Sequence, residues 1–585
     1  MDKKQVVEIL DEIGTLLEIM GENPFKSRAY SGASRALLAM PGELDDIIKE
    51  TGLKGVKGIG EGIRERILEL HATGRLAYYD ELKASVPAGL MDMLRIPGLG
   101  PKKAKALYDN LGVKSIGELE YACHENRLVG LPGFGEKTQG NILQGIAFVK
   151  KHAELYLYSF AEAEAAKILG PIQKSKSVIR ASIAGSIRRR KEITKDIDIV
   201  AATDDPAAVM ELFTTLPDVE HVVAKGDTKS SVVLKSGIAS DLRTVTDLEF
   251  PYALHHFTGS KLHNTAMRGR AKKMDLKMNE YGLFKGKAEM FIPCKDETEI
   301  FRALGLVYIP PELREDMGEI EAAEKGELPV LVEDGDIKGT FHVHSRYSDG
   351  RDEIAEIAEA ARRLGWQYIG LTDHSPTAAY AGGLKPEDLK RQQAEIDEVN
   401  KRYKDFHIFK GAEVDILPDG TLDYPDTILE KLDFTVCSIH SKFNMTEDEA
   451  TRRIVKAMEN PHFTILGHPT GRLLLSREGY PLNMRKVIEA ASEYGVAIEL
   501  NAHPIRLDID WREMKYAKSL GVKIAINPDA HNLGGLKDVR YGIGIARKGW
   551  LEKADVLNTM GLAEISNYLA AGRPGKAAGN KKAAK

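Results

Sequence analysis

Residues 185–200 read GSIRRRKEITKDIDIV and join a basic segment to an acidic strand. Asp196 and Asp198 stand two apart in an apolar run, so on a β-strand both carboxylates point to one face. Two carboxylates held side by side repel each other unless a cation lies between them. Upstream, Gly185 and Ser186 open a helical segment whose free backbone N–H groups can hold phosphate oxygens. The stretch therefore predicts a place where metal ions and a phosphate chain meet.

A third carboxylate, Asp241, lies in a second predicted strand that follows a turn at residues 235–237. Three acids against two divalent ions leave about one positive charge, which a triphosphate can neutralise. The alternative is that paired aspartates mark only a solvated strand edge.

The order and spacing of Gly-Ser, the arginines, Asp-x-Asp and the later motif at residues 257–260, FTGS, resemble a family X DNA polymerase of the polymerase beta type. The resemblance implies a nucleotidyltransferase palm with a thumb, formed from a sheet that we expect to be antiparallel. It implies that Asp196, Asp198 and Asp241 are catalytic and hold Mg²⁺ or Mn²⁺. Gly185, Ser186 and Arg189 would then hold the triphosphate.

Three polar residues after the FTGS motif, Lys261, Asn264 and Arg268, are spaced by three and four, which places them on one helical face. An ordinary solvated basic face is the alternative. The resemblance implies a lid in which Gly259, Lys261 and Asn264 contact the nucleotide and Arg268 contacts the DNA. Template-independent members of the family insert a long loop at the turn 235–237, and the short turn here leaves no room for it, so the resemblance implies template-directed synthesis.

The first 150 residues repeat one device, a Gly-x-Gly turn between helical patterns, at residues 55–60, 96–103 and 131–137. Glycine lets the backbone approach a phosphate closely, and the next helix begins with free N–H groups. A single turn of this kind is usually only a turn, but three in series resemble helix-hairpin-helix motifs, which grip DNA without reading its sequence. The predicted DNA contacts are Gly58, Gly60, Gly98, Gly100, Gly133 and Gly135.

Tyr30 is placed where the 5′-phosphate pocket of the polymerase beta family begins, and it is a further predicted DNA contact. Arg66 stands where lyase-competent members carry the Schiff-base lysine. A guanidinium stays protonated and cannot form that adduct. We therefore predict no lyase activity of this type; a covalent adduct that is lost on mutating a nearby lysine such as Lys57 would overturn the prediction.

From Lys338 onward, short apolar strands alternate with amphipathic helices, which is typical of an α/β barrel. Metal-type side chains stand at the predicted strand ends, and the carboxyl ends of barrel strands meet at one mouth. Imidazole and carboxylate together suit zinc, manganese or iron, and we expect up to three ions. Isolated histidines at strand ends are usually core or surface residues, but so many at equivalent places favour metal binding. The predicted ligands are His342, His344, Asp349, His374, Glu413, His440, His468, Asp529 and His531.

This ligand pattern resembles the polymerase and histidinol phosphatase (PHP) domain. The resemblance implies a distorted (β/α)7 barrel with 3′ to 5′ exonuclease activity, or processing of 3′ ends and abasic sites. Alternatives are a purely structural PHP domain, a small-molecule phosphatase and a DNA-end scaffold.

A length of 585 residues, 43% of them hydrophobic, and a net charge of -5 indicate several soluble globular domains, and three scattered cysteines fit a reducing compartment. The resemblances imply a multidomain α+β and α/β fold. We expect a cytoplasmic, nucleoid-associated monomer that acts in base excision repair on gapped or nicked DNA with deoxynucleoside triphosphates, away from membranes. The predicted domains are a helical DNA-binding domain (1–90), fingers (91–150), palm (151–246), thumb (247–310), an acidic linker (311–337), the PHP domain (338–571) and a disordered basic tail (572–585).

Overall fold

The computed structural model describes residues 1, 3–40, 44–56, 58–150, 155–286 and 288–571. It divides into two compact units, Met1–Lys150 and Lys151–Lys585, and each is described by itself. Lys57 and the predicted tail, residues 572–585, lie outside the described residues. None of the described helices has the length and apolar character that a membrane crossing needs.

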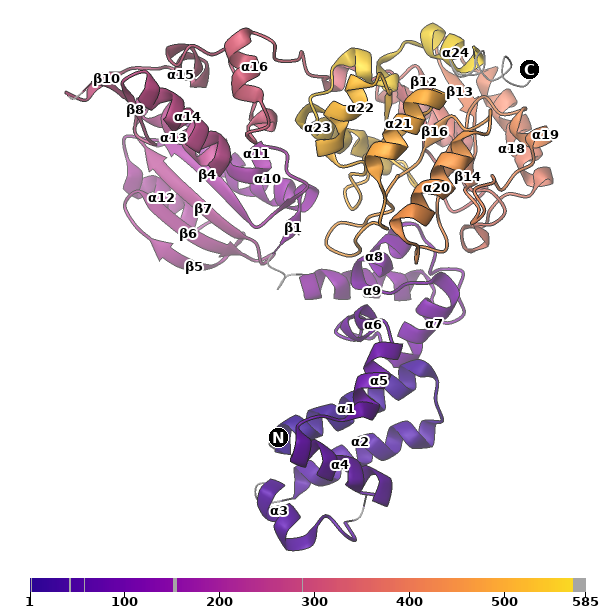
Figure 1. The fold of residues 1–585 in the computed structure, drawn as a ribbon. Coiled ribbons are helices and arrows are strands. Elements are labelled where there is room, and N and C mark those ends of the chain that lie inside the picture. Colours follow the sequence, from indigo (N-terminus) through magenta and orange to yellow (C-terminus); the bar gives the residue numbers. More distant parts are fainter. Residues whose placement is uncertain (2, 41–43, 57, 151–154, 287, 572–585) are drawn as a thin grey trace. The chain divides into compact units, whose positions relative to one another are not determined.

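In the first unit the regular elements of the described residues are all helices, joined by turns (Figure 1). Helix α1 shows why: Val6, Leu10, Ile13 and Leu17 recur at helical spacing, and all four are fully buried. The helices are α1 Lys3–Met20, α2 Pro24–Ala39, α3 Leu44–Thr51, α4 Glu61–Thr73, α5 Ala77–Ser85, α6 Ala88–Met93, α7 Pro101–Leu111, α8 Ile116–His124 and α9 Glu136–Lys150.

The second unit begins with a five-stranded sheet in the order β2-β4-β7-β6-β5. Strands β4 and β7 are parallel and the other neighbours are antiparallel, so the expected antiparallel sheet is mixed. Helix α12 follows β4 and provides the crossover that parallel strands require, a feature that residue periodicity does not reveal. The elements are β1 Tyr156–Leu157, α10 Tyr158–Lys174, β2 Arg180–Ile183, α11 Gly185–Arg188, β3 Ile193–Thr194, β4 Asp196–Ala202, α12 Pro206–Thr214, β5 Val219–Lys225, β6 Lys229–Leu234 and β7 Ala239–Val245.

A smaller helical layer with a three-stranded sheet follows, and the acidic segment 311–337 packs onto it. Ile320 and Ala323 share a hydrophobic core with Tyr252 and Phe301, and Glu319 is fully buried against His263. The segment is therefore folded and not an extended linker, because its acids find basic partners that are distant in sequence. The elements are α13 Phe250–Thr258, α14 Lys261–Lys273, β8 Leu276–Met278, β9 Leu283–Lys285, β10 Met290–Ile292, α15 Glu297–Ala303, η1 Pro311–Leu313, α16 Glu319–Lys325 and η2 Asp334–Asp336.

The remaining residues form two parallel sheets, β11-β12-β13 and β14-β15-β16-β17-β18, interleaved with helices. Single parallel bridges, His374 to Glu413 and Val343 to Ala530, link the sheets at both seams. The predicted parallel α/β architecture is present, and the closed sevenfold barrel stays a prediction. The strands are β11 Gly339–Thr340, β12 Tyr368–Leu371, β13 His407–Lys410, β14 Glu413–Asp415, β15 Val436–Ser438, β16 Ile465–Leu466, β17 Ala497–Asn501 and β18 Ile524–Asn527. The helices are α17 Ile354–Arg363, η3 Ala379–Ala381, α18 Pro386–Asn400, α19 Asp426–Leu429, α20 Glu447–Met458, α21 Met484–Tyr494, α22 Trp511–Ser519, η4 Gly535–Asp538, α23 Val539–Lys548, η5 Lys553–Asp555, η6 Leu557–Thr559 and α24 Leu562–Ala570.

Candidate functional site

Three carboxylates meet on adjacent strands of the mixed sheet. Asp198 on β4 is the register partner of Asp241 on β7, and Asp196 lies two residues earlier on β4. The intervening Ile197 is fully buried, so the aspartates share the opposite, more open face. The structure thus brings together the three acids that the sequence singled out.

The electrostatics of this trio suit a divalent cation. Burial, with Asp196 and Asp241 close by, raises the pKa of Asp198 to about 6. Burial and Asp241 also raise the pKa of Asp196. The Nζ of Lys229 lies 2.6 Å from Asp241 Oδ2 and offsets part of the negative charge. Divalent metal ions bound between the three carboxylates would relieve their mutual repulsion.

Gly185 lies directly against Asp198 of the trio, and Ser186 follows it in the chain. Gly185 has a φ of +62°, and a Cβ there would stand 2.2 Å from Asp198 Oδ2, so only glycine fits without displacing the carboxylate. Ser186 Oγ lies 2.5 Å from Thr194 Oγ1, which ties helix α11 to strand β3. A phosphate chain held at this helix start would lie beside the carboxylates.

Arg189 and Gly259 are also brought together. Arg189 Nη1 donates to the carbonyl oxygen of Thr258 over 2.5 Å, and its Nε lies 3.0 Å from Glu315 Oε1. Gly259 has a φ of +69°, and a Cβ there would stand 3.1 Å from Arg189 Nη1. Glycine therefore leaves room for the guanidinium.

The three polar residues of α14 are placed differently from one another. Asn264 is buried, and its Nδ2 donates to the carbonyl oxygen of His256 over 2.7 Å. Asn264 and the exposed Arg268 line one small cavity with His256. Lys261 is exposed and is not among the lining residues. All three residues lie on helix α14 at the predicted spacing, and their nucleotide and DNA contacts stay predictions.

In the first unit, the three Gly-x-Gly turns have one geometry. The first glycine of each turn has a positive φ: +97° at Gly58, +81° at Gly98 and +84° at Gly133. The carbonyl oxygen of the second glycine accepts the first hydrogen bond of the helix that follows, from Arg64, Ala104 and Gln139 respectively. A Cβ at Gly60, Gly98, Gly100, Gly133 or Gly135 would meet nothing within 4 Å. The turns therefore offer open backbone at a helix start, the geometry that phosphate contacts require.

Tyr30 lies in the core, not on an exposed surface, since its exposed fraction is 2%. Its ring stacks at 6.4 Å from the ring of Tyr78, and the Cζ of Arg66 lies 3.8 Å from the centre of the Tyr78 ring. Arg66 is thus held by a cation–π contact. A DNA contact through Tyr30 stays a prediction.

The nine predicted metal ligands converge at the carboxyl ends of the parallel strands. Three groups have ligand atoms within 4.8 Å of one another, and they share His344 and His374. His468 adjoins the third group, with its Nε2 3.1 Å from Glu413 Oε1. The groups are His344, Asp349, His374 and His531; His342, His344 and Asp529; and His374, Glu413 and His440.

Burial and neighbouring charges shift the pKa values of the histidines in this cluster in opposite directions. Burial and the neighbouring His531 lower the pKa of His344 to about 3. Burial also lowers the pKa of His440, but Glu413 and Asp415 outweigh it and raise that pKa to about 10. Metal ions would take the place of protons and balance the buried carboxylates.

Two carboxylates that the sequence analysis missed orient the ligands. Glu499 Oε1 lies 2.7 Å from His342 Nδ1, and its Oε2 accepts from the backbone N–H of His468 over 2.6 Å. Asp415 Oδ1 lies 2.8 Å from His440 Nδ1. Such bonds fix the imidazole tautomer and leave Nε2 for a metal. The sequence could have indicated Glu499 through its position as a charged residue in the run 497–501, where the structure shows it fully buried.

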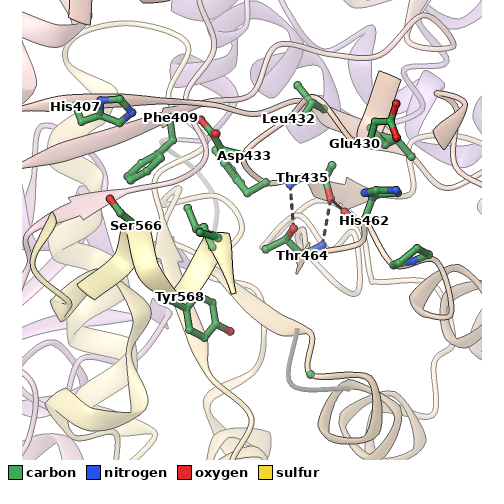
Figure 2. Close-up of a pocket in the computed structure, with 16 residues that line it drawn as sticks. His407, Phe409, Glu430, Leu432, Asp433, Thr435, His462, Thr464, Ser566 and Tyr568 are labelled. Carbon is green, nitrogen blue, oxygen red and sulfur yellow. Dashed lines mark hydrogen bonds between the residues drawn. The ribbon is translucent and has the colours of Figure 1, made fainter. Parts of the chain in front are cut away.

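A cavity of about 530 Å³ lies away from this cluster (Figure 2). Its lining includes His407, Thr435 and Thr464, which stand at or just before the starts of β13, β15 and β16, whereas the metal-type residues follow the strand ends. Thr435 and Thr464 close one wall through reciprocal hydrogen bonds of 3.2 and 3.1 Å. This cavity is therefore separate from the candidate metal site.

Three clustered carboxylates and, apart from them, three overlapping groups of candidate metal ligands thus occur in one chain. Family models agree: DNA polymerase beta thumb matches residues 253–315, PHP domain 340–503, Helix-hairpin-helix domain 1–76 and SAM-like Helix-hairpin-helix tandem 90–147.

Curated relatives cover the whole chain or its last part. The DNA polymerase/3′-5′ exonuclease PolX of Bacillus subtilis (strain 168) is 40% identical over 573 residues, which are 97% of this chain and 99% of that protein. A probable phosphatase of Thermoanaerobacter sp. (strain X514) is 33% identical over 232 residues, 37% of this chain and 87% of that protein. The chain belongs to the PolX family of DNA polymerase/3′-5′ exonucleases.

Proposed function

We propose that this chain is a DNA-directed DNA polymerase that fills short gaps in base excision repair and processes 3′ ends through its PHP domain. The observation that carries the polymerase half is the register of Asp198 with Asp241 beside Gly185. A helix start beside three clustered carboxylates supports the binding of a phosphate chain next to metal ions.

Each residue of the first site has a proposed task. Asp196, Asp198 and Asp241 would hold two Mg²⁺ or Mn²⁺ ions, which supply Lewis-acid activation of the primer 3′-OH and charge stabilisation of the pyrophosphate. Gly185, Ser186 and Arg189 orient the triphosphate. Outside that set, Gly259, Lys261 and Asn264 contact the nucleotide and Arg268 the DNA.

The helix-hairpin-helix turns would hold gapped or nicked duplex through its phosphates. They present backbone N–H groups, so the grip is independent of base sequence. The family and this chemistry support a cytoplasmic, nucleoid-associated enzyme, which we propose acts as a monomer.

The PHP site would hold up to three zinc, manganese or iron ions and hydrolyse phosphodiesters at DNA 3′ ends. Glu499 and Asp415 hold the Nδ1 atoms of His342 and His440, which leaves the Nε2 atoms for the cluster. The convergence of six imidazoles and three carboxylates supports hydrolysis over the alternative, a purely structural domain.

A labelled primer in a short-gapped duplex, incubated with manganese, tests both halves. Templated lengthening with deoxynucleotides and shortening without them is the expected result. Lengthening alone would leave the PHP domain structural or selective for other ends. Shortening alone would contradict the polymerase assignment.

A further inference from the structure

Helix α23 of the PHP part contacts the palm at the proposed triphosphate site. Lys548, the last residue of this helix, is fully buried. Its Nζ donates to the backbone carbonyl oxygen of Arg189 over 3.1 Å and lies 2.5 Å from Glu315 Oε1. The Arg189 Nε lies 3.0 Å from the same Glu315 oxygen. One carboxylate oxygen is therefore shared by a palm arginine and a PHP lysine.

The charges of this triad depend on one another. Burial raises the pKa of Glu315, but Lys548 and Arg189 outweigh it and keep the carboxyl ionised. A buried ammonium is costly without a paired anion, so Lys548 is held in place by Glu315. In return, Lys548 balances Glu315, so that the carboxylate is not neutralised by Arg189 alone.

The contact extends along the helix. A Cβ at Gly544 would stand 3.2 Å from Arg190 Cδ, and the ring of Tyr541 meets that of Tyr158 edge-on at 6.0 Å. Arg540 Nη2 lies 3.3 Å from Glu162 Oε2. One face of α23 therefore packs against helix α10 and against Arg190, which adjoins Arg189.

We propose that Lys548 is a positioning residue for nucleotide binding at the polymerase site. It fixes the Arg189 backbone directly and the Arg189 side chain through Glu315, which aims the guanidinium at the incoming triphosphate. The inference rests on the proposed role of Arg189. It makes the PHP part a structural component of the polymerase site, independent of its own metal cluster.

The adjacent residue provides a matched control. Arg547 Nε lies 2.7 Å from Glu312 Oε1. Arg547 therefore joins helix α23 to the acidic segment 311–337, which also carries Glu315, without contacting Arg189. Arg547→Met removes a cation from this interface, whereas Lys548→Met removes the cation that holds Arg189.

The test uses the full chain on a single-nucleotide gap, with the Michaelis constant for the nucleotide, the turnover rate and the exonuclease rate measured on each preparation. Lys548→Met is expected to raise the Michaelis constant about tenfold and to leave exonuclease activity within about twofold. Arg547→Met is expected to change neither by more than about twofold. An unchanged Michaelis constant in folded Lys548→Met, or an equal fall of both activities, would overturn the inference.

Two further variants keep the test decisive if Lys548→Met folds poorly. Glu315→Gln should also raise the Michaelis constant, and adding Lys548→Met to it should cost less than the product of the single effects, because both charges are then gone. Purely multiplicative effects would contradict a shared carboxylate. Arg189→Ala distinguishes failure of the proposed role of Arg189 from failure of the inferred role of Lys548. If Arg189→Ala leaves nucleotide affinity unchanged, the proposed role of Arg189 is wrong. If Arg189→Ala lowers nucleotide affinity but Lys548→Met does not, only the role of Lys548 is wrong.

Discussion

Asp198 on β4 and Asp241 on β7 are register partners in two adjacent parallel strands. The chain leaves β4 through helix α12 before it returns to β7. If the two aspartates hold the ions for nucleotidyl transfer, Asp198→Asn should lower primer extension on the order of 10³-fold or more. Exonuclease activity of the same preparation should persist, since the PHP ligands are untouched. Asp204→Asn, at an exposed palm position, is the control. Loss of both activities would contradict two separate sites.

The reverse experiment alters the metal cluster. His440→Ala removes a ligand that contacts both Glu413 and Asp415, so hydrolysis of 3′ ends should be lost while gap filling continues. Metal content measured on the purified variant should fall relative to the parent chain. Unchanged trimming with reduced metal would favour the structural PHP alternative.

A single methyl group should disable synthesis. Gly185→Ala places a Cβ 2.2 Å from Asp198 Oδ2 and forces a residue with a side chain into a left-handed conformation. Extension should fall at least about tenfold, because a small displacement of a metal ligand is enough for such a loss. Gly170→Ala on α10, where a Cβ meets nothing within 4 Å, should leave extension unchanged. Equal activities in the two variants would show that Asp198 tolerates displacement.

Glu499→Gln tests the orientation of the metal ligands. The change keeps the size of the side chain but weakens its hold on His342 Nδ1, so exonuclease activity should drop about 10- to 100-fold. Gap filling should stay constant, and Glu493→Gln on the exposed face of α21 should affect neither activity. An exonuclease unaffected by Glu499→Gln would mean that packing alone orients His342.

Lyase chemistry should be absent. Arg66 occupies the position of the expected lysine and stacks on Tyr78, where a guanidinium cannot become a Schiff base. Borohydride treatment with DNA carrying an abasic 5′ end should trap no covalent adduct. An adduct that disappears when a nearby lysine is mutated would contradict this prediction.

Much of both sites could be predicted from the sequence because their chemistry depends on local spacing. Side-chain alternation along a strand was enough to predict that Asp196 and Asp198 share a face. The position of the histidines after the predicted strands was enough to predict that they cluster. The parallel pairing of β4 with β7 depends on how a crossover folds, and Glu315 with Lys548 depends on contacts 233 residues apart. Asn264 was assigned to the correct helix, but its burial depends on His256 in the preceding helix, a contact that helical spacing does not reveal.

The folded acidic segment limits how a DNA 3′ end can pass between the polymerase site and the PHP site. Because residues 311–337 pack into the second unit, the palm and the PHP part are not joined by a slack tether that could swing one catalytic centre toward the other. A mispaired terminus would then have to reach the second site through movement of the DNA strand itself, by unpairing or by rebinding, and not through a swinging domain.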